Sequence, residues 1–390
     1  MDIGTQVKQL FKEKFGHPPV YLVRAPGRVN LLGEHVDYND RFVLPAAIDR
    51  ATYIAFSEVG SNQNSVFAVD FGQQALFLPE NLESKSQSDG TPLPDWAKYP
   101  AGVAWALSGN NRAIKGMCAV FSSDIPRGAG LSSSASVELA FATAWKILGG
   151  WKATPMELAL LCQRAENKYV GVNCGIMDQF ASACGEKDRL LLLDCRSLEY
   201  KSLPLPDSIV IVIADTTVRH THTTSAYNDR RAACEQAVQI LKQDLPDIKA
   251  LRDVSIADLN RFSMKLPAEV EMRARHVVKE IDRTNRAVKL LDSGDIEGFG
   301  QLMNACHASL RDLYQVSCPE LDVMVNVAQS FGGCYGARLT GGGFGCCKAN
   351  LVSRDKAELF TKSLSAKYEA ATRLHPEIYT CQASPGAGLI

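Results

Sequence analysis

A segment rich in glycine and serine, residues 126–136, most constrains the fold of this chain, because it joins a predicted strand to an apolar helix. The strand is predicted over residues 117–122 and the helix over residues 137–148. Small residues let backbone N–H groups turn inward, and the start of a helix adds unpaired donors and the positive end of a dipole. A flexible linker, the alternative interpretation, is not expected between a strand and an apolar helix. The segment therefore predicts a phosphate-binding loop. It is not a Walker loop, since no Gly-Lys-Ser/Thr follows, and Ser133 replaces the last glycine of a G-x-G-x-x-G fingerprint.

A second glycine-rich segment covers residues 340–345 and is followed by an apolar run typical of a strand. A strand in that place, where a helix would be needed, argues against a dinucleotide-binding fingerprint. A glycine-lined hairpin is the alternative interpretation. Four glycines in the five positions 341–345 exceed what a hairpin requires. The segment therefore predicts close approach of the backbone to a ligand.

Residues 26–39 begin as an apolar run and end in turn residues, with several charged side chains between. They include Arg28, Glu34, His35 and Asp37. Charged side chains beside an apolar segment are costly to bury unless they are partnered or used. The pattern predicts a polar ligand held by several short hydrogen bonds, with one cation close by.

Two further acids lie among apolar neighbours, Asp178 in the segment 173–180 and Glu166 on the preceding predicted helix. A carboxylate in such surroundings must be partnered or take part in chemistry. A buried ion pair is the structural alternative for each of them, and the sequence leaves that alternative open.

With 390 residues the chain is too long for one ordinary core, so we expect two domains. The proline-rich run 203–207 is the best candidate for a junction, which gives domains of residues 1–205 and 206–390. Further helices are predicted over residues 1–16, 96–107, 155–170, 225–243 and 267–312, strands over 190–194 and 209–214, and a loop over 79–94. The helix over 155–170 has a clear start, because Thr154, Pro155 and Glu157 form a capping box with proline at the first position, and Gly171 is placed to end it.

Composition excludes several classes of partner. Lys and Arg number 42 against 43 for Asp and Glu, and no basic run is present, so neither nucleic acid nor a membrane surface is expected. The N-terminal helix is amphipathic and unlike a signal peptide.

Twelve cysteines are scattered without a C-x-x-C pair, and only His220 and His222 lie near each other, which argues against zinc. Mostly buried free thiols in a reducing cytoplasm are the simpler interpretation. Oligomeric state is not readable from the sequence.

Together the three motifs resemble the galactokinase family within the GHMP superfamily of small-molecule kinases. The runs Cys-Gly-Ile-Met-Asp-Gln-Phe at residues 174–180 and Arg-His-Val-Val at residues 275–278 match that family as well. The resemblance extends from the N-terminal helix to about residue 350. It implies an α+β, two-domain GHMP-kinase-like fold with mixed sheets and helices, and an active site in the cleft between the domains.

The resemblance also implies an activity, the transfer of the γ-phosphate of ATP to the anomeric hydroxyl of galactose, giving galactose 1-phosphate and ADP. Carried over by position, Asp178 is the catalytic carboxylate facing the 1-hydroxyl, and Arg28 stabilises the phosphoryl group and keeps Asp178 ionised. Ser134 and Glu166 are the implied ligands of Mg²⁺. The implied sugar contacts are Glu34, His35, Asp37, Gly175 and Tyr227. The implied nucleotide contacts are Gly128, Ala129, Gly130, Leu131, Ser132, Ser133, Ser134, Ala135 and Ser136, with Trp96 and Tyr99 near the adenine.

Four positions depart from the family pattern. Val36 stands where threonine is common, Arg41 and Cys346 where glycine is usual, and Leu313 where an acid is common. Arg41 either forces a negative φ or adds a cation at the rim of the sugar site. The alternatives are a kinase for a related sugar, such as N-acetylgalactosamine or arabinose, and a catalytically silent sugar sensor. A sensor should lack parts of the phosphate loop, whereas residues 132–136, Glu166 and Asp178 are all present.

Overall fold

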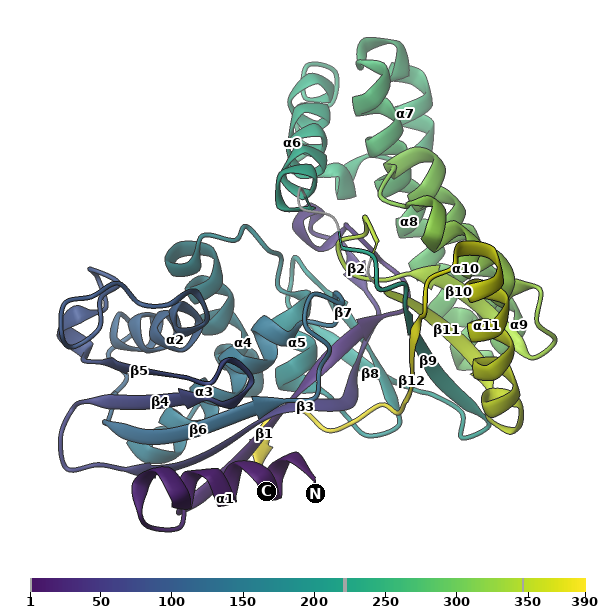
Figure 1. Ribbon diagram of the computed structural model, residues 1–390. Coiled ribbons are helices and arrows are strands. Elements are labelled where there is room, and N and C mark those ends of the chain that lie inside the picture. The colour runs from purple at the N-terminus through teal and green to yellow at the C-terminus, as the bar shows by residue number, and fades with distance from the viewer. Residues whose placement is uncertain (1, 220–222, 346) are drawn as a thin grey trace.

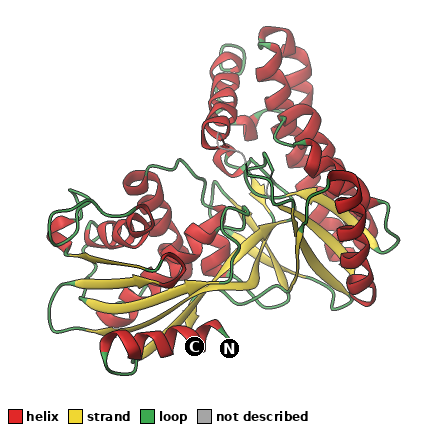
Figure 2. Ribbon diagram, viewed as in Figure 1, coloured by secondary structure: helices red, strands yellow, loops and turns green. Residues whose placement is uncertain are grey.

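The computed structural model describes residues 2–219, 223–345 and 347–390. Its first half is built on a six-stranded sheet with the order β13-β1-β3-β6-β4-β5, seen as yellow arrows on the left of Figure 2. All neighbours are antiparallel except β4 and β6, so the sheet is mixed, as expected. The strands are β1 (Tyr21–Asn30), β3 (Pro45–Glu58), β4 (Asn64–Ala68), β5 (Gln73–Phe77), β6 (Met117–Ser123) and β13 (Gly388–Leu389).

Helices cover both faces of this sheet (Figure 1). Helix α1 (Ile3–Phe15) packs Val7 and Phe11 on one face, and its N-cap Asp2 accepts a hydrogen bond from the Thr5 N–H. The other face carries α2 (Lys98–Ser108), α3 (Ser133–Gly149), α4 (Pro155–Arg164) and α5 (Met177–Cys184). The predicted loop over residues 79–94 holds only short turns, among them a 3₁₀ turn at Pro79–Asn81.

The second half contains a four-stranded antiparallel sheet with the order β10-β11-β9-β12. Its strands are β9 (Ile209–Asp215), β10 (Cys334–Leu339), β11 (Cys347–Ser353) and β12 (Glu377–Cys381). One face packs against α10 (Pro319–Gln329) and α11 (Ala357–Thr372). The remaining helices are α6 (Thr223–Leu241), α7 (Ile256–Phe262), α8 (Ala268–Ser293) and α9 (Ile296–Ser309). In Figure 1, α6, α7 and α8 project upward from the middle of the molecule.

A small three-stranded sheet is made of β2 (Phe42–Val43), β7 (Arg189–Asp194) and β8 (Tyr200–Pro204), and it lies between the two larger ones (Figure 1). The last strand, β13, returns to pair with β1, and both chain ends lie near α1 (Figure 1). The predicted domain boundary between residues 205 and 206 stays a prediction. Strand β13 comes after that boundary in the sequence, but it belongs to the sheet of the first half.

Most predicted elements are present, and two need correction. The strands predicted over 117–122, 190–194 and 209–214 are confirmed as β6, β7 and β9. Helix α3 begins at Ser133, four residues before the predicted start at 137, because Ser132 adopts the left-handed conformation and lets the serines enter the first turn. The long helical stretch predicted over 267–312 is helical over most of its length, but it consists of two helices, α8 and α9. Gly294, with φ of 76°, ends α8, and the Asp295 carboxylate caps α9 by accepting from the Gly298 N–H.

The helix predicted over residues 155–170 changes character in its last turn. Its capping box forms as expected, but residues Ala165–Val170 make a wider π-helical turn that ends at Gly171 with φ of 98°. A π-turn displaces side chains from the α-helical register and occurs often at functional sites. This turn carries Glu166.

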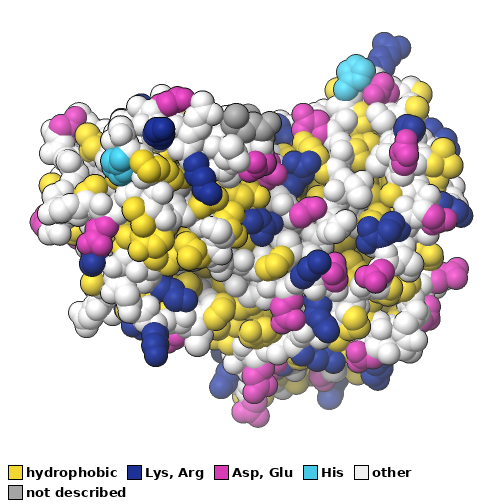
Figure 3. Space-filling model, turned by 90° about the horizontal axis from the view of Figure 1, so that it is seen from below, with side chains coloured by type: hydrophobic (Ala, Val, Ile, Leu, Met, Phe, Trp, Pro, Cys, Tyr) yellow, Lys and Arg dark blue, Asp and Glu magenta, His cyan; other side chains and the backbone are white. Residues whose placement is uncertain are grey.

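Charged side chains of both signs are interspersed over the face shown in Figure 3. No helix within the described ranges combines the length and the apolar character that crossing a bilayer requires. The described cysteines are all free thiols. His220 and His222, the pair considered for zinc, and Cys346 lie outside the described residues.

Candidate active site

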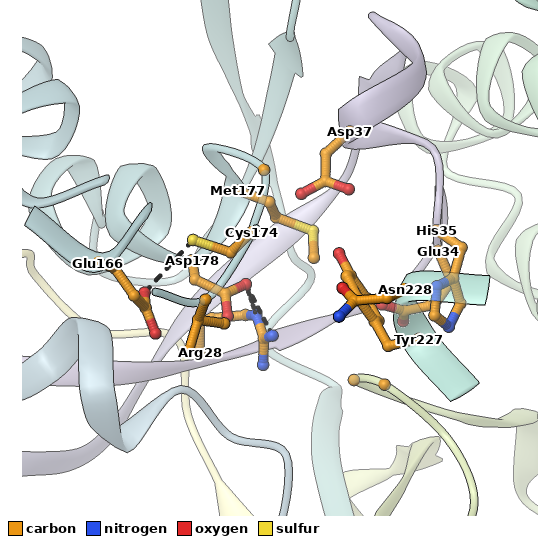
Figure 4. Close-up of a pocket in the computed structure, with 14 residues that line it drawn as sticks. Arg28, Glu34, His35, Asp37, Glu166, Cys174, Met177, Asp178, Tyr227 and Asn228 are labelled. Atoms are coloured by element: carbon orange, nitrogen blue, oxygen red, sulfur yellow. Dashed lines mark hydrogen bonds and ion pairs between the residues drawn. The ribbon is translucent and has the colours of Figure 1, made fainter. Parts of the chain in front are cut away.

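A cavity of about 250 Å³ opens where the two halves of the molecule meet (Figure 4). Its walls come from β1 and the turn after it, from the π-turn and α5, from the start of α6, and from the loop between β10 and β11. The lining residues are Arg28, Glu34, His35, Asp37, Glu166, Val172, Cys174, Gly175, Met177, Asp178, Tyr227, Asn228, Gly341 and Gly342. The residues predicted for catalysis and for sugar contact are thus all brought together.

Arg28 and Asp178 form an ion pair at one side of this cavity, drawn with dashed lines in Figure 4. Arg28 Nε lies 2.8 Å and its terminal nitrogen 2.7 Å from the same carboxylate oxygen of Asp178. Arg28 is also held by the glycine-rich loop, because its side chain donates to the Gly130 carbonyl at 2.7 Å and its N–H donates to the Leu131 carbonyl at 3.1 Å. A Cβ at Gly27 would lie 2.7 Å from that Leu131 oxygen, so glycine is what permits the close approach.

The second oxygen of Asp178 accepts a hydrogen bond of 2.6 Å from Ser132. Ser132 has φ of 59°, a conformation that few non-glycine residues adopt, and it directly precedes α3. The Asp178 side chain stays about a quarter exposed. Its carboxylate is therefore fixed from two sides and still reaches the cavity, which suits a group that orients or deprotonates a substrate hydroxyl.

Glu34, His35 and Tyr227 lie across the cavity from Asp178 (Figure 4). Burial raises the pKa of Glu34, against the effect of its ion pair with the buried Arg338. Burial lowers the pKa of His35 to about 3, so its imidazole is neutral. A neutral ring and a carboxylate offer both donors and acceptors to a polyol.

Asp37 points into the cavity from above in the view of Figure 4. Burial and the nearby charge of Asp178 raise the pKa of Asp37 to about 7. A Cβ added to Gly175 would lie only 1.9 Å from the Asp37 carboxylate, so Gly175 makes room for this side chain. The ring of Tyr227 lies 5.5 Å from that of His35.

Glu166 is buried at the other end of the cavity. Its carboxylate accepts from Gln179 at 2.5 Å and from the Cys174 thiol at 3.4 Å. Burial, and next the charge of Asp178, raise the pKa of Glu166 to about 7, while a hydrogen bond from Ser134 opposes the rise. No group of three or more metal-ligating side chains occurs among the residues that the structure describes.

Ser134 and Glu166 nevertheless suit a magnesium ion, because Mg²⁺ commonly binds one or two protein oxygens and completes its shell with water and phosphate. A buried carboxylate whose pKa is raised lacks a compensating positive charge. A bound cation would supply that charge.

A second cavity of about 290 Å³ is lined in part by the start of α3. It is mainly apolar and contains both predicted adenine contacts, Trp96 and Tyr99, together with Ser133 and Ser134. Trp96 stacks on Phe71 with ring centres 6.2 Å apart. The first N–H groups of α3 have no partner within the helix, so the part of this cavity beside the start of α3 suits an anion.

Not every predicted loop residue faces a cavity. Ser136 is fully buried, donates its hydroxyl to the Ala25 carbonyl at 2.7 Å, and gives its N–H to the Ser132 carbonyl. Ser136 thus ties α3 to β1, and Ala129 and Leu131 are buried too. The roles predicted for these residues remain predictions.

The glycine-rich segment 340–345 serves two purposes. It connects β10 and β11, which pair antiparallel, so the hairpin interpretation describes its topology. It also approaches the first glycine-rich loop, because a Cβ at Gly341 would lie 2.8 Å from the Gly130 carbonyl oxygen. Gly341 and Gly342 line the first cavity, beside Arg28 and Asp178, as expected for a backbone that comes close to a ligand.

Three of the four departures from the family pattern can be placed. Val36 is buried in the core. The Arg41 side chain is buried and donates to the Leu251 carbonyl at 2.8 Å, and it does not line the cavity. The preceding residue, Asp40, has a positive φ, whereas Arg41 has a negative φ. Of the two alternatives for Arg41, a negative φ or a cation at the rim of the sugar site, the structure therefore has the first. Leu313 is half-buried, and its carbonyl accepts from Arg273.

Several residues with a place at the site were not predicted. Arg338 pairs with Glu34, Glu280 accepts from the Gly33 N–H, and Asn228 lines the cavity. Arg338 lies two residues before the glycine-rich segment 340–345, and this closeness was the one available signal in the sequence.

Matches to known protein families and to related proteins extend along the whole chain. The galactokinase galactose-binding signature matches residues 9–58, and the GHMP kinase N-terminal and C-terminal domains match residues 98–186 and 287–370. A galactokinase of Roseiflexus sp. strain RS-1 is 45% identical over 100% of this chain and 98% of its own length. A galactokinase of Chloroflexus aurantiacus is 42% identical over 97% of this chain and 96% of its own.

Among solved structures, Lactococcus lactis galactokinase complexed with galactose superposes with a TM-score of 0.92 at 34% identity, covering 98% of both chains. The mevalonate kinase of L. major, in complex with R-mevalonate, has a TM-score of 0.61 at 21% identity and covers 94% of this chain and 98% of its own. The second likeness concerns the fold alone.

Proposed function

The chain belongs to the galactokinase family, and from that premise we propose that it transfers the γ-phosphoryl group of ATP to the anomeric hydroxyl of galactose, giving galactose 1-phosphate and ADP. Its fold is the GHMP kinase fold, and its class is that of an ATP-dependent sugar kinase. The observation that carries the proposal is the Arg28–Asp178 ion pair, which faces Glu34, His35 and Tyr227 across one cavity.

In this proposal the sugar lies between Asp178 and the polar groups opposite it. Asp178 accepts a hydrogen bond from the 1-hydroxyl and receives or orients its proton. Arg28 neutralises charge on the transferring phosphoryl group, where developing negative charge needs a preorganised cation. Glu34, His35 and Asp37 hold the remaining hydroxyls, with Gly175 and Tyr227 completing the wall.

The nucleotide is proposed to lie in the second cavity, with adenine near Trp96 and Tyr99 and its phosphates over residues 128–136. Ser133, Ser134 and Ala135 at the start of α3 offer N–H donors for those phosphates. Ser134 and Glu166 would hold Mg²⁺, which would supply positive charge to neutralise the phosphates. A reducing cytoplasm as its compartment is supported by the free thiols.

A coupled ADP-release assay with Mg-ATP, run on galactose, N-acetylgalactosamine, arabinose and glucose, tests the proposal. We expect galactose to give the highest kcat/KM. A higher value with N-acetylgalactosamine or arabinose would assign the site to that sugar. Absence of turnover with every sugar, together with measurable galactose binding, would establish the sensor instead.

A further inference from the structure

The turn that carries two of the proposed sugar-binding residues has an unfavourable backbone. Gly33 has φ of 79° and His35 has φ of 59°, so two left-handed residues flank Glu34. A Cβ at Gly33 would lie 2.5 Å from the Phe42 carbonyl oxygen. A non-glycine residue such as His35 in this region costs about 1 kcal/mol. The turn Gly33–His35 therefore depends on contacts from elsewhere to keep its shape.

Helix α8 supplies two of these contacts, from residues nearly 250 positions away in the sequence. The Gly33 N–H donates to Glu280 Oε1 at 2.9 Å. One turn earlier on the same helix, His276 Nε2 lies 3.3 Å from the Glu34 carbonyl oxygen, at hydrogen-bonding distance. Both side chains are fully buried, and neither lines the cavity. Neither side chain can touch a sugar in the cavity, so each would act on it indirectly, above all through the backbone of the turn that it holds.

Glu280 is well suited to hold an N–H group. Its other carboxylate oxygen accepts from Arg283 at 2.6 Å, and Oε1 also accepts from the Cys306 thiol at 2.9 Å. Burial alone would raise the pKa of Glu280, but the charge of Arg283, the hydrogen bond from Cys306 and other nearby groups together outweigh that effect, and the pKa is lowered. A hydrogen bond to an ionised acceptor is roughly twice as strong as a neutral one.

We propose that Glu280 is a positioning residue for sugar recognition, which fixes the backbone of the Gly33–His35 turn and thereby the directions of the Glu34 and His35 side chains. The inference rests on the proposed function, because it concerns the same sugar site. It assigns Glu280 no contact with the sugar and no part in phosphoryl transfer. Loss of Glu280 should therefore weaken sugar binding, while ATP binding and the rate of phosphoryl transfer should stay nearly unchanged.

Steady-state kinetics of Glu280→Leu, with galactose and ATP varied separately, test this. An unpaired buried N–H costs about 1–3 kcal/mol, so we expect the KM for galactose to rise roughly tenfold or more. We expect kcat and the KM for ATP to stay within threefold of wild type. Glu280→Gln keeps an acceptor for the Gly33 N–H and should restore the KM for galactose to within about threefold.

Leu291→Ala on the same helix is the matched control, because Leu291 is buried in the core and has no contact with the turn. It should lower Tm and leave the KM for galactose unchanged. If Glu280→Leu does not fold, Glu280→Asp replaces it, since the shorter side chain draws the carboxylate away from the Gly33 N–H but keeps its charge.

An unchanged KM for galactose in a folded Glu280→Leu or Glu280→Asp variant would overturn the inference, and so would an equal rise in the KM for ATP. Wild-type turnover tests the proposed function separately. If wild type shows preference for another sugar, the same ratios are measured with that sugar. If it shows no turnover, the galactose Kd from calorimetry replaces the KM, and absence of sugar binding by wild type overturns both proposals.

Discussion

At the scale of a residue, the burial of Asp37, a proposed sugar-binding group, lowers the stability of the folded chain at neutral pH. Burial raises the pKa of Asp37 from 3.8 to about 7, with the charge of Asp178 adding to the effect. Between pH 4 and pH 7 the folded chain therefore retains a proton that the unfolded chain releases. Linkage then makes stability fall as pH rises through that window.

Asp37→Asn removes this ionisation and should be more stable than wild type at pH 8. Because the side chain is half-buried, we expect a gain of roughly 1–2 kcal/mol, well below the full value of the shift. At pH 5, early in the window between pH 4 and pH 7, the unfolded wild type already releases its proton, so the gain in Tm should be present but clearly smaller than at pH 8. The KM for galactose should rise at the same time, since one acceptor is lost. Thermal melts at the two pH values measure this, and equal differences at both would contradict the explanation.

At the scale of elements, the site depends on contact between two glycine-rich loops. Gly341 in the β10–β11 loop has φ of 78° and would place a Cβ 2.8 Å from the Gly130 oxygen. Gly130 in turn supplies the carbonyl that holds Arg28. A change in one loop should therefore alter the position of Arg28, the proposed catalytic arginine.

Gly341→Ala is expected to lower the free energy of unfolding by about 1–3 kcal/mol, from the left-handed conformation and the close contact together. It should also reduce kcat through displacement of Gly130. Gly342→Ala is a matched control for stability, because a Cβ there meets nothing within 4 Å and its φ needs no glycine. Denaturant unfolding of both variants makes the comparison, and equal losses of stability would show that loop contact is not the cause.

Sequence reasoning worked for elements whose signals are local. The strand β6 and the capping box of α4 follow from a short apolar run and from three neighbouring residues. The break at Gly294 was missed because the apolar periodicity continues on both sides of it. The predicted start of α3 was late because serines fit a loop and a first helical turn equally well.

The candidate site likewise contains residues that the sequence predicts and residues that only the fold brings in. Arg28, Glu34, His35 and Asp178 were predictable because family motifs contain them. Arg338 and Glu280 support the same turn from more than 240 residues away, and no spacing rule brings such positions together. The family motifs name the groups around the ligand, whereas the contacts that hold those groups need the fold.

At the scale of the whole molecule, a buried ion pair joins the two halves. Arg338 on β10 has no exposed surface and pairs with Glu34, whose exposure is 3%. Removing one partner of a buried pair leaves a charge without compensation and typically costs 3–5 kcal/mol. Glu34 thus belongs both to the proposed sugar site and to the junction of the two halves.

Arg338→Leu should therefore lower the free energy of unfolding by roughly 3–5 kcal/mol and weaken sugar binding. The double variant Glu34→Gln/Arg338→Leu should recover part of the stability, because no unpaired charge remains, but none of the sugar affinity. A double-mutant cycle in urea measures the coupling. Additive effects of the two single changes would contradict a direct interaction across the halves.

The most direct test of the central claim, that Asp178 acts on the sugar hydroxyl, is single-turnover phosphorylation of galactose by Asp178→Asn with galactose binding measured on the same sample. Asparagine keeps the shape and a hydrogen-bonding oxygen but removes the charge. We predict that the rate falls by a factor on the order of a thousand or more, within the 10²–10⁴-fold range of a lost acid–base group, while the Kd for galactose changes less than about tenfold. A rate within tenfold of wild type, in a variant that still binds galactose, would contradict the assignment of Asp178.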